Sequence, residues 1–548
     1  MGKITLTLPD GDTITAAPGE NLNELARGAS GLILAARLDN ELVPLDTVPG
    51  HDARLEWVTY GEKAGQEAYQ RSASFVLNMA VTELYHNTRL VIGHSISNGF
   101  YYDFFCGIPV TQELLNEITV RMREISGRDL PFRRRLLPRA EAILYLAGRG
   151  MSDSRRLVEN STIERAQIYE CGNFANLEIY PLAFSTAAVS RFELKSYSPG
   201  FVILFPEPEN FAVNSNIGKT RKLFQIYQES KNWGKILGVS DVGRLNQIIA
   251  RDNVSEIIKV AEALHEKKIA RIADTITTRR EDLRLVLVTG PSAAGKTTFC
   301  KRLSAQLQVN GIRPLALSMD NYFVDREACP RDENGEFDFE ALEALDLDLF
   351  NRHLSDLLEG REVAVPKFDF ETGRRAAGHR LMWLEDDQLL LVEGIHALNS
   401  RISASVPDRH KFRIYISALT QLTINDHSRI STTDTRMLRR MVRDSRYRNY
   451  NAAQTLKRFP SVIRGERRNT FPFQENADVM FNSALAYELA VLKDLAVPLL
   501  EKIPREDETC PEARRLLNFL MLFLPVAADE VPPTSILREF IGGSSFRY

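Results

Sequence analysis

The sequence predicts an α/β fold built around a parallel sheet that carries a phosphate-binding loop. Four apolar residues at 285–288 predict a strand that is buried on both faces. The string from Gly290 to Thr298 then matches G-x-x-x-x-G-K-[ST], and apolar residues at helical spacing follow it. Two further apolar runs, at 314–318 and 388–392, predict more buried strands. A buried strand, a glycine-rich loop and a helix in this order are typical of sheets that bind nucleotides.

The loop is expected to hold the phosphates of a nucleotide. Glycines let the backbone curl so that successive N–H groups point inward, and the following helix adds its positive dipole end. Lys296 is placed to reach the β- and γ-phosphates, Thr297 to bind Mg²⁺ and Thr298 to contact the α-phosphate. The predicted nucleotide-binding residues are Gly290, Pro291, Ser292, Ala293, Ala294, Gly295, Lys296, Thr297 and Thr298.

Composition predicts an ordinary cytoplasmic protein with several domains. At 548 residues, the chain is long enough for about three or four domains. The formal net charge of −3 gives no global attraction to nucleic acid, so any basic surface must be local. The first residues alternate and do not form the apolar centre of a secretion signal, and the longest apolar run, 516–528, is too short to span a bilayer. No paired spacing relates the five cysteines, which are expected to be reduced thiols: Cys106, Cys171, Cys300, Cys329 and Cys510.

Residues 1–60 predict a small domain of short strands. Apolar residues alternate with polar ones at 4–8 and again at 13–15, and the turn sequence between them indicates a hairpin. Asn21 is expected to cap a short helix, with further strands at 32–37 and 54–58. In LPDG and LDNELVPLD, this segment resembles the TGS domain at the N-terminus of threonyl-tRNA synthetases. The resemblance implies a β-grasp-like module without chemistry of its own.

The resemblance to threonyl-tRNA synthetase continues through residues 61–235. The string VIGHSISNGFYYDF is similar to that enzyme's α+β second domain, which is shared with alanyl-tRNA editing proteins. The family's deacylation site uses an H-x-x-x-H pair and a C-x-x-x-H pair. This sequence has Arg71 and Phe75 at the first pair, and Glu178 and Leu182 at the second. We therefore expect a scaffold with a degenerate editing site.

Two acids follow predicted strands of the sheet in residues 281–480. Asp320 comes after the strand at 314–318, and Glu393 after the strand at 388–392. Because ligands bind at the carboxyl ends of parallel strands, both side chains are expected beside the phosphate loop. Asp320 could take a proton from an acceptor hydroxyl or bind Mg²⁺ through water. Glu393 is placed to hold the metal.

An arginine cluster at 436–448 has three interpretations: a nucleic-acid-binding patch, a solvated helix face, or a lid that closes over a transferring phosphoryl group. The phosphate loop upstream favours the lid. The remaining segments predict a helical connector at 236–280 and a C-terminal helical extension at 481–548, with an amphipathic helix at 484–500. The connector could transmit a signal or act as a packed tether, and the extension could pack on the core or pair subunits.

Taken together, residues 281–480 resemble the uridine kinase family, relatives of phosphoribulokinase. The similar strings are GPSAAGKTT, SMDNYF, GEFDFE, VAVPKFDF, LLLVEGI and DTRMLRRMVRD, in the family's order. The resemblance implies that Asp320 is the general base on a ribose 5′-hydroxyl and that Thr297 and Glu393 hold Mg²⁺. It also implies that Asp338 and Arg440 grip the ribose hydroxyls, and that Arg443 and Arg448 are lid residues on the nucleotide phosphates.

Two departures concern the base-reading part of the pocket. Phe368 stands where the family has a tyrosine, and Gly373 where it has a histidine. A pocket that loses hydrogen-bonding groups loses discrimination between bases. Phosphoryl transfer to a sugar hydroxyl is therefore a firmer expectation than uridine as the substrate, with Phe368 still expected in the substrate site.

These observations predict a magnesium-dependent nucleoside kinase that transfers the γ-phosphoryl of ATP or GTP to a 5′-hydroxyl, with uridine or cytidine as the expected substrate class. The expected catalytic residues are Asp320, Lys296 and Arg443. One alternative is a kinase for another small hydroxyl compound. A second is a nucleotide-switched regulator that binds tRNA or another RNA through the synthetase-like half.

Overall fold

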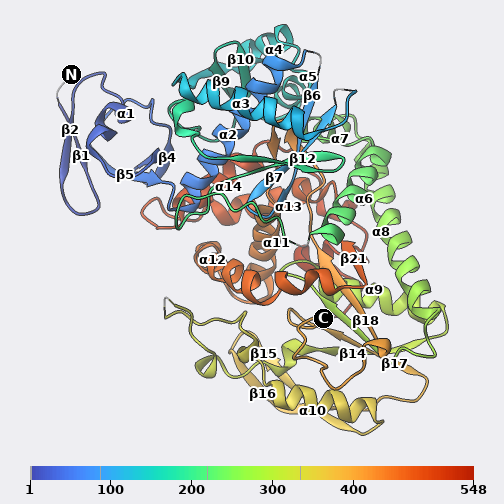
Figure 1. Ribbon diagram of the computed structural model, residues 1–548. Helices are drawn as coiled ribbons and strands as arrows, with labels where there is room; N and C mark the ends of the chain where they lie inside the picture. Colours follow the sequence, from blue (N-terminus) through green and yellow to red (C-terminus); the bar gives the residue numbers. More distant parts are fainter. Residues whose placement is uncertain (1–2, 87, 106, 219, 334, 548) are drawn as a thin grey trace.

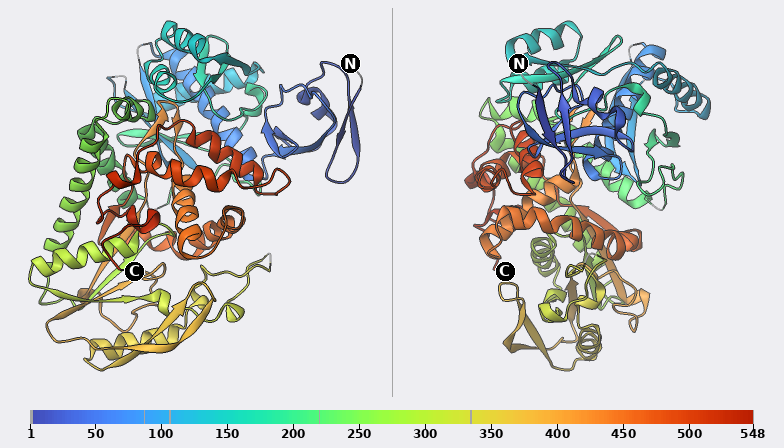
Figure 2. Two further views of the ribbon diagram at one scale, coloured as in Figure 1. Left: turned by 180° about the vertical axis from the view of Figure 1, so that it is seen from behind. Right: turned by 90° about the vertical axis from the view of Figure 1, so that its left-hand side faces the viewer.

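The computed structural model describes residues 3–547 except 87, 106, 219 and 334, so Cys106 lies outside the described residues. The blue N-terminal sheet stands to one side of the rest, the synthetase-like segment forms the top, and the nucleotide-binding sheet lies at the bottom (Figure 1). The views in Figure 2 agree on this arrangement. The four described cysteines are unpaired and buried. Among the described residues, we find no helix with the length and apolar character needed to cross a membrane.

The N-terminal segment folds into a five-stranded sheet of order β2-β1-β5-β3-β4. The predicted hairpin and both further strands are confirmed. The predicted cap is also confirmed, because the Asn21 side chain accepts a hydrogen bond from Glu24 N at 3.1 Å. In return, Asn21 N donates to the Glu24 carboxylate at 3.0 Å. The elements are β1 (Ile4–Thr7), β2 (Thr13–Ala16), α1 (Leu22–Leu25), β3 (Ile33–Leu38), β4 (Glu41–Val43) and β5 (Ala53–Thr59).

The synthetase-like segment contains two antiparallel sheets beside a long buried helix. One sheet has the order β10-β9-β8 and the other β11-β12-β7-β6. The helices are α2 (Lys63–Leu84), α3 (Gln112–Gly127), α4 (Arg139–Gly148) and α5 (Ser152–Glu159). The strands are β6 (Arg89–Ile96), β7 (Gly99–Phe105), β8 (Arg133–Pro138), β9 (Arg165–Cys171), β10 (Phe174–Leu177), β11 (Glu193–Tyr197) and β12 (Gly200–Leu204).

Three helices connect the two halves: α6 (Arg221–Leu237), α7 (Val242–Ile249) and α8 (Val254–Thr277). Residues 236–280 are helical as predicted, whereas α6 lies almost wholly before the predicted start of the connector. The long helix α8 runs down one side of the molecule from the upper half to the lower sheet (Figure 1). It packs against α9 (Lys296–Val309), where Arg302 donates to Glu262 at 3.2 Å and to Glu266 at 2.7 Å. The ion pairs of the buried Arg302 thus fix the connector to the nucleotide-binding half.

The lower half is built on a five-stranded, all-parallel sheet of order β14-β17-β13-β18-β21, which confirms the predicted α/β core. Its strands are β13 (Leu285–Thr289), β14 (Arg313–Ser318), β17 (Gln388–Glu393), β18 (Lys411–Ser417) and β21 (Val479–Asn482). Its other elements are α10 (Leu347–Leu358), the hairpins β15 (Val363–Asp369) with β16 (Arg374–Met382) and β19 (Thr423–Asn425) with β20 (Ser428–Arg429), α11 (Thr432–Tyr447) and α12 (Ala452–Asn469).

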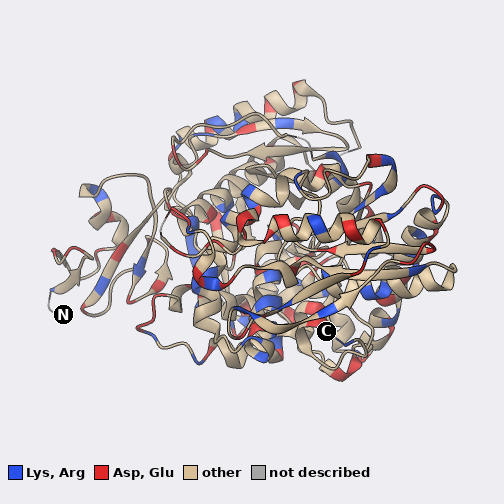
Figure 3. Cartoon of the chain, turned by 90° about the horizontal axis from the view of Figure 1, so that it is seen from below, with Lys and Arg blue, Asp and Glu red and all other residues tan. Residues whose placement is uncertain are grey.

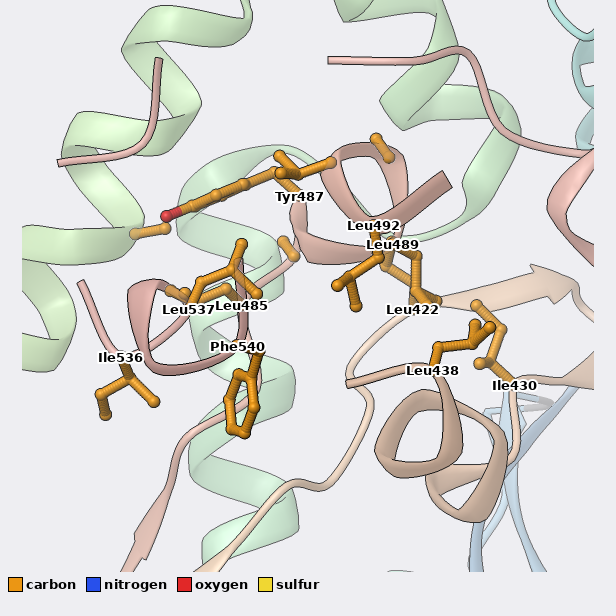
Figure 4. Packing of buried hydrophobic residues seen from close by; sticks show 14 of the residues in the cluster. Leu422, Ile430, Leu438, Leu485, Tyr487, Leu489, Leu492, Ile536, Leu537 and Phe540 are labelled. Carbon is orange, nitrogen blue, oxygen red and sulfur yellow. The ribbon is translucent and has the colours of Figure 1, made fainter. Parts of the chain in front are cut away.

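The C-terminal extension is helical, with α13 (Glu488–Leu500), α14 (Cys510–Leu520) and α15 (Arg538–Ile541). The expectation of an amphipathic helix at 484–500 is wrong. Helix α13 is buried over most of its surface because α11, α12 and α14 all pack against it. Figure 4 shows Ile536, Leu537 and Phe540 of the last segment beside Leu485 and Tyr487.

One hydrophobic cluster extends from Leu137 in the synthetase-like segment to Ile541 near the C-terminus. The two halves therefore share a core, and the boundaries expected between them stay predictions. Acidic and basic residues are interspersed along the described chain (Figure 3), in keeping with the small net charge.

Candidate functional site

A cavity of about 790 Å³ opens at the carboxyl ends of β13, β14 and β17. Its volume lies within the roughly 300–1,000 Å³ that is usual for ligand sites. The lining includes the phosphate loop, both predicted strand-end acids and three arginines of the 436–448 cluster. The parallel sheet thus brings together residues that are about a hundred positions apart in the chain.

The phosphate loop has the shape that its glycines allow. A side chain at Gly290 would meet the main-chain oxygen of Ile416 at 2.3 Å, so the loop passes too close to β18 for any other residue. Gly295 adopts a φ of +84°, a left-handed conformation that favours glycine, and α9 begins directly after it. The Lys296 ammonium donates to the loop's own Pro291 carbonyl oxygen at 3.2 Å.

The predicted metal-binding residues lie side by side. Thr297 Oγ1 is 3.4 Å from Glu393 Oε1, and Ser318 Oγ donates to the same carboxylate oxygen at 2.8 Å. Burial, together with the nearby Asp320 charge, raises the pKa of Glu393 to about 7. Asp320 lines the cavity, and within the described chain no side chain donates a hydrogen bond to its carboxylate. This end of the cavity therefore offers a cluster of oxygen ligands and one free carboxylate.

Two arginines of the cluster hold the phosphate loop from behind. Arg436 is 3% exposed, donates to the Ser292 carbonyl at 2.9 Å and pairs with Glu466. Arg439 is fully buried, donates to the Ala293 carbonyl at 3.3 Å and pairs with Glu488. These two residues are structural supports of the loop, so the lid interpretation is wrong for them. Their burial also removes them from any exposed basic patch.

The other arginines of the cluster reach the cavity. Arg440, Arg443 and Arg448 all line it and surround the carboxylate of Asp444, at 3.2, 2.7 and 3.7 Å respectively. Arg440 also donates to Ser292 Oγ at 2.7 Å. Their placement beside the phosphate loop fits the predicted contact with phosphates.

The structure does not bring Asp338 to the cavity wall. Its carboxylate accepts a hydrogen bond from Glu340 N at 3.1 Å, and Arg440 pairs with Asp444 and Ser292 instead. Glu340 lines the cavity in its place, with a pKa that burial and the adjacent Glu466 raise to about 7. The segment is irregular here, so no periodicity indicated which of its acids faces inward. Of the two residues expected to grip the ribose hydroxyls, only Arg440 therefore lines the cavity.

The hairpin of β15 and β16 supplies an aromatic wall. Phe368 lies against Phe323 and Phe370, with ring centroids 5.5 and 5.2 Å apart. A side chain at Gly373, whose φ is +72°, would meet the guanidinium of Arg326 at 2.6 Å. Arg326 thus occupies the space beside the position where the family has a histidine. The sequence contained no motif that pointed to this arginine.

The most distant contribution to the site comes from the C-terminal segment. The Glu539 carboxylate accepts hydrogen bonds from the Thr298 main-chain N–H at 3.0 Å and from Thr298 Oγ1 at 2.8 Å. On the opposite side of the loop, Glu466 accepts from Ser292 N at 2.6 Å. Both carboxylates use donors of the loop that are expected to bind phosphate. Neither could be found from sequence, because each belongs to a separate segment without a recognisable pattern.

The positions that correspond to the editing site form a second, separate place in the molecule. Arg71 and Glu178 line a smaller cavity where the upper half meets the lower half, whereas Phe75 and Leu182 are buried in the hydrophobic core of the upper half. Burial raises the pKa of Glu178 to about 7, while Arg71 and the amide of Asn176 act in the opposite direction. The residues present here are not those of a deacylation site of the family's kind.

The parallel sheet, the phosphate loop and the strand-end acids define the lower half as a P-loop kinase fold. Residues 285–485 match the family model described as Phosphoribulokinase / Uridine kinase family. The resemblance of this segment to that family is thereby confirmed.

The N-terminal part of about 200 residues matches threonine–tRNA ligases. The protein from Pelobacter propionicus is 32% identical over 205 residues, which are 37% of this chain and 32% of that protein. The protein from Rubrobacter xylanophilus is 33% identical over 202 residues, which are 36% and 31% of the two chains. The chain thus spans about a third of the length of these ligases.

Among solved structures, a possible uridine kinase from Bacillus stearothermophilus is similar at 20% identity, with a TM-score of 0.28 over 39% of this chain and 98% of that one. D-glycerate 3-kinase from Cryptococcus neoformans is similar at 14% identity, with a TM-score of 0.23 over 48% and 89% of the two chains. The assignment of the fold rests on the sheet and the family model.

The raised pKa of Glu178 predicts a pH-dependent stability. The unfolded chain ionises this group near its ordinary value of 4.5, whereas the folded protein keeps the proton until about pH 7. The stability of the folded protein therefore falls as the pH rises through this window. For Glu178→Gln, we expect the melting temperature to rise relative to that of the wild type between pH 5 and pH 8. The rise corresponds to a relative change in the free energy of unfolding of up to about 3 kcal/mol.

Thermal melts of both proteins at the two pH values measure this difference. Glu164→Gln, at an exposed position of the same segment, is the matched control and should track the wild type. A constant difference between Glu178→Gln and the wild type at both pH values would contradict the prediction.

Proposed function

We propose that this chain is a magnesium-dependent nucleoside kinase that moves the γ-phosphoryl of ATP or GTP to a nucleoside 5′-hydroxyl, with uridine or cytidine as the substrate class. One observation carries the proposal. Asp320 and Glu393 stand at the ends of the neighbouring strands β14 and β17, in one cavity with the phosphate loop and an aromatic wall. A binding module that only senses nucleotide does not need a free carboxylate at this position.

The acceptor is oriented by Asp320. Its carboxylate lacks a side-chain donor among the described residues, so it is free to accept a hydrogen bond from a substrate hydroxyl. A general base needs to be within hydrogen-bond reach of the proton that it takes, and the position of Asp320 on the cavity wall supports this role for a hydroxyl bound beside it. Positioning the hydroxyl against the γ-phosphorus is the main task of the protein in such a transfer.

The donor phosphates are held by the loop and the cations around it. Lys296 gives up its contact with the Pro291 carbonyl to reach the β- and γ-oxygens. Arg443 and Arg448, which also line the cavity, then stabilise the negative charge of the transferring group. Burial and the adjacent Arg443 lower the pKa of Arg448 to about 10. Because this value is still above neutral pH, the guanidinium keeps its positive charge and attracts an anion such as phosphate.

The residues around Glu393 fit a magnesium ion. Thr297 Oγ1, Ser318 Oγ and the Glu393 carboxylate are hard oxygen donors, which Mg²⁺ prefers. Within the described part of the chain, no group of three or more histidine, cysteine or acidic residues forms a complete metal site. This fits an ion that takes one carboxylate from the protein and other ligands from water and nucleotide phosphates. When bound, Mg²⁺ supplies charge neutralisation at the phosphates.

The remaining part of the cavity best suits an acceptor substrate that carries a flat ring system. Phe368 and Phe370 offer apolar faces, and Arg326 beside Gly373 offers hydrogen-bond donors. A donor-only arginine recognises carbonyl groups of a base, which supports a pyrimidine carrying such groups.

A kinase for another small hydroxyl compound is the second candidate, and the replacement of the family's tyrosine and histidine by Phe368 and Gly373 favours it. Assays of the purified protein against ribonucleosides, deoxyribonucleosides and sugar phosphates separate the two. We expect phosphorylation of a pyrimidine ribonucleoside; turnover of a sugar phosphate alone would establish the second candidate.

The RNA-binding regulator stays a prediction without support from the arginine cluster. Arg436 and Arg439, which helped to motivate it, are buried and support the phosphate loop.

Asp320→Asn is expected to lower kcat by about 10²–10⁴-fold, because the amide keeps the shape of the side chain but cannot take the proton. The affinity for ATP, measured by calorimetry, should stay near that of the wild type. Asp386→Asn, at an exposed position before β17, is the control and should keep full turnover. Wild-type kcat in Asp320→Asn would show that this residue is not the base.

Glu539→Gln is expected to raise the affinity for ATP by about tenfold, because the wild-type carboxylate takes the Thr298 N–H that a phosphate would use and repels the incoming anion. Binding of a fluorescent ATP analogue to the full-length protein measures the change. The control is Glu530→Gln, an exposed acid of the same segment. Weaker nucleotide binding in Glu539→Gln would mean that the carboxylate helps to build the site.

A further inference from the structure

A second cavity, of about 140 Å³, lies between the synthetase-like half and the nucleotide-binding half. From the upper half, α2, β6, β7 and residues 178–180 contribute to its lining. From the lower half come the β19–β20 hairpin, the start of α11 and helix α14. The hairpin is fixed to the upper sheet, since Ile92 N donates to the Asp426 carbonyl at 2.8 Å. The cavity is therefore a built feature of the contact between the halves.

Two of the three arginines in this cavity have no charged partner. Arg515 is satisfied, because it forms a two-pronged pair with Asp434 at 2.7 and 2.8 Å. Arg71 donates only to the Pro181 carbonyl oxygen, at 3.0 and 3.2 Å, and Arg429 lies over the ring of Phe100. Neither forms an ion pair with any residue that the structure describes, and the Nε of Arg429 is buried without a hydrogen-bond partner. Burial lowers the pKa of both arginines.

The acids of the cavity compensate these charges only in part, because Glu67 attracts both arginines without forming an ion pair with either among the described residues. Asp434 is taken by Arg515, and Glu67 makes a long contact of 3.6 Å with Lys63. Glu178 accepts from the Asn176 amide at 2.7 Å, and burial raises its pKa to about 7, so it carries only part of a charge at neutral pH. Buried charges in proteins are normally paired, because an unpaired one costs several kcal/mol. The cavity is thus short of negative charge.

The cavity also adjoins the N-terminus of α11. Ser431, the residue before the helix, lines the cavity and makes no side-chain capping bond. The first N–H groups of a 16-residue helix and its dipole attract anions. Two unpaired guanidinium groups and a helix N-terminus thus converge on one small space, with Ile92, Phe100 and Phe519 forming apolar walls.

We propose that this cavity binds a small anion through a carboxylate or phosphate group, held by Arg71 and Arg429 at the start of α11. Arginine is the side chain suited to both groups, because its planar fork of donors matches their oxygens. The ligand is small, because the volume is well below the roughly 300–1,000 Å³ of sites for drug-sized molecules. This site lies outside the kinase cavity and does not depend on the proposed function.

Thermal melts of the full-length protein test the proposal, with sodium acetate and sodium phosphate as the two probes and sodium chloride at equal ionic strength as the reference. We expect a rise in melting temperature of several degrees with at least one probe, and the one that acts identifies the group. Phosphate can also bind the phosphate loop, so Lys296→Ala is measured in parallel. The rise that remains in Lys296→Ala does not come from the phosphate loop.

Arg429→Met decides whether the rise comes from this site. Removing an unpaired buried charge should leave the melting temperature without probe equal to or above that of the wild type, which a structural arginine would not do. The same variant should lose the response to acetate or phosphate. Arg133→Met, at an exposed position of β8, is the matched control and should keep it.

The proposal is overturned if neither probe stabilises the wild type, or if Arg429→Met and Arg71→Met respond as the wild type does. A fall in the melting temperature of Arg429→Met without probe would also count against it, since that result assigns the arginine a role in the fold. None of these measurements needs phosphoryl transfer, so their failure would leave the proposed kinase activity standing.

Discussion

The structure depends on how the phosphate loop is held. A loop that points its N–H groups inward turns its carbonyls outward, and those carbonyls need donors when they are buried. Arg436 and Arg439 of α11 supply them, at the carbonyls of Ser292 and Ala293. Each arginine is in turn neutralised by a buried glutamate from another helix.

The C-terminal extension packs around Arg439 and the phosphate loop. Helix α13 brings Glu488 to Arg439, and the ring of Phe540 lies 5.1 Å from the same guanidinium. Ile536 fills the space in front of Gly295, so the loop is packed on both sides. Figure 4 shows Phe540 and its apolar neighbours Leu485 and Leu537 in this part of the core. Removing one partner of such a buried ion pair leaves an uncompensated charge and lowers the stability of the folded protein. The extension is therefore part of the nucleotide-binding half.

Sequence reasoning succeeded where chemistry follows a local pattern. The loop motif and the strand ends placed Thr297 beside Glu393, because neighbouring parallel strands end at the same edge of the sheet. It failed where a residue arrives from an irregular or distant segment. Glu340 faces the cavity while Asp338 does not, and nothing in the spacing of an irregular segment distinguishes them.

The arginine cluster shows the same limit. The arginines from 436 to 446 share helix α11 and Arg448 follows it directly, so the sequence suggested one role for all of them. The side of a helix that becomes buried depends on its neighbours in space, and α11 is enclosed by α12, α13 and α15. Arg436 and Arg439 therefore became supports, while Arg440 and Arg443 stayed at the cavity.

The chain joins two segments that are similar to two different families. These segments are not separable parts. The Asn425 amide on β19 donates to the Leu177 carbonyl at 3.1 Å, and Asn246 of the connector donates to the Leu522 carbonyl at 2.7 Å. Because one hydrophobic cluster runs through both segments, removing the synthetase-like segment would expose apolar surface of the nucleotide-binding half to water.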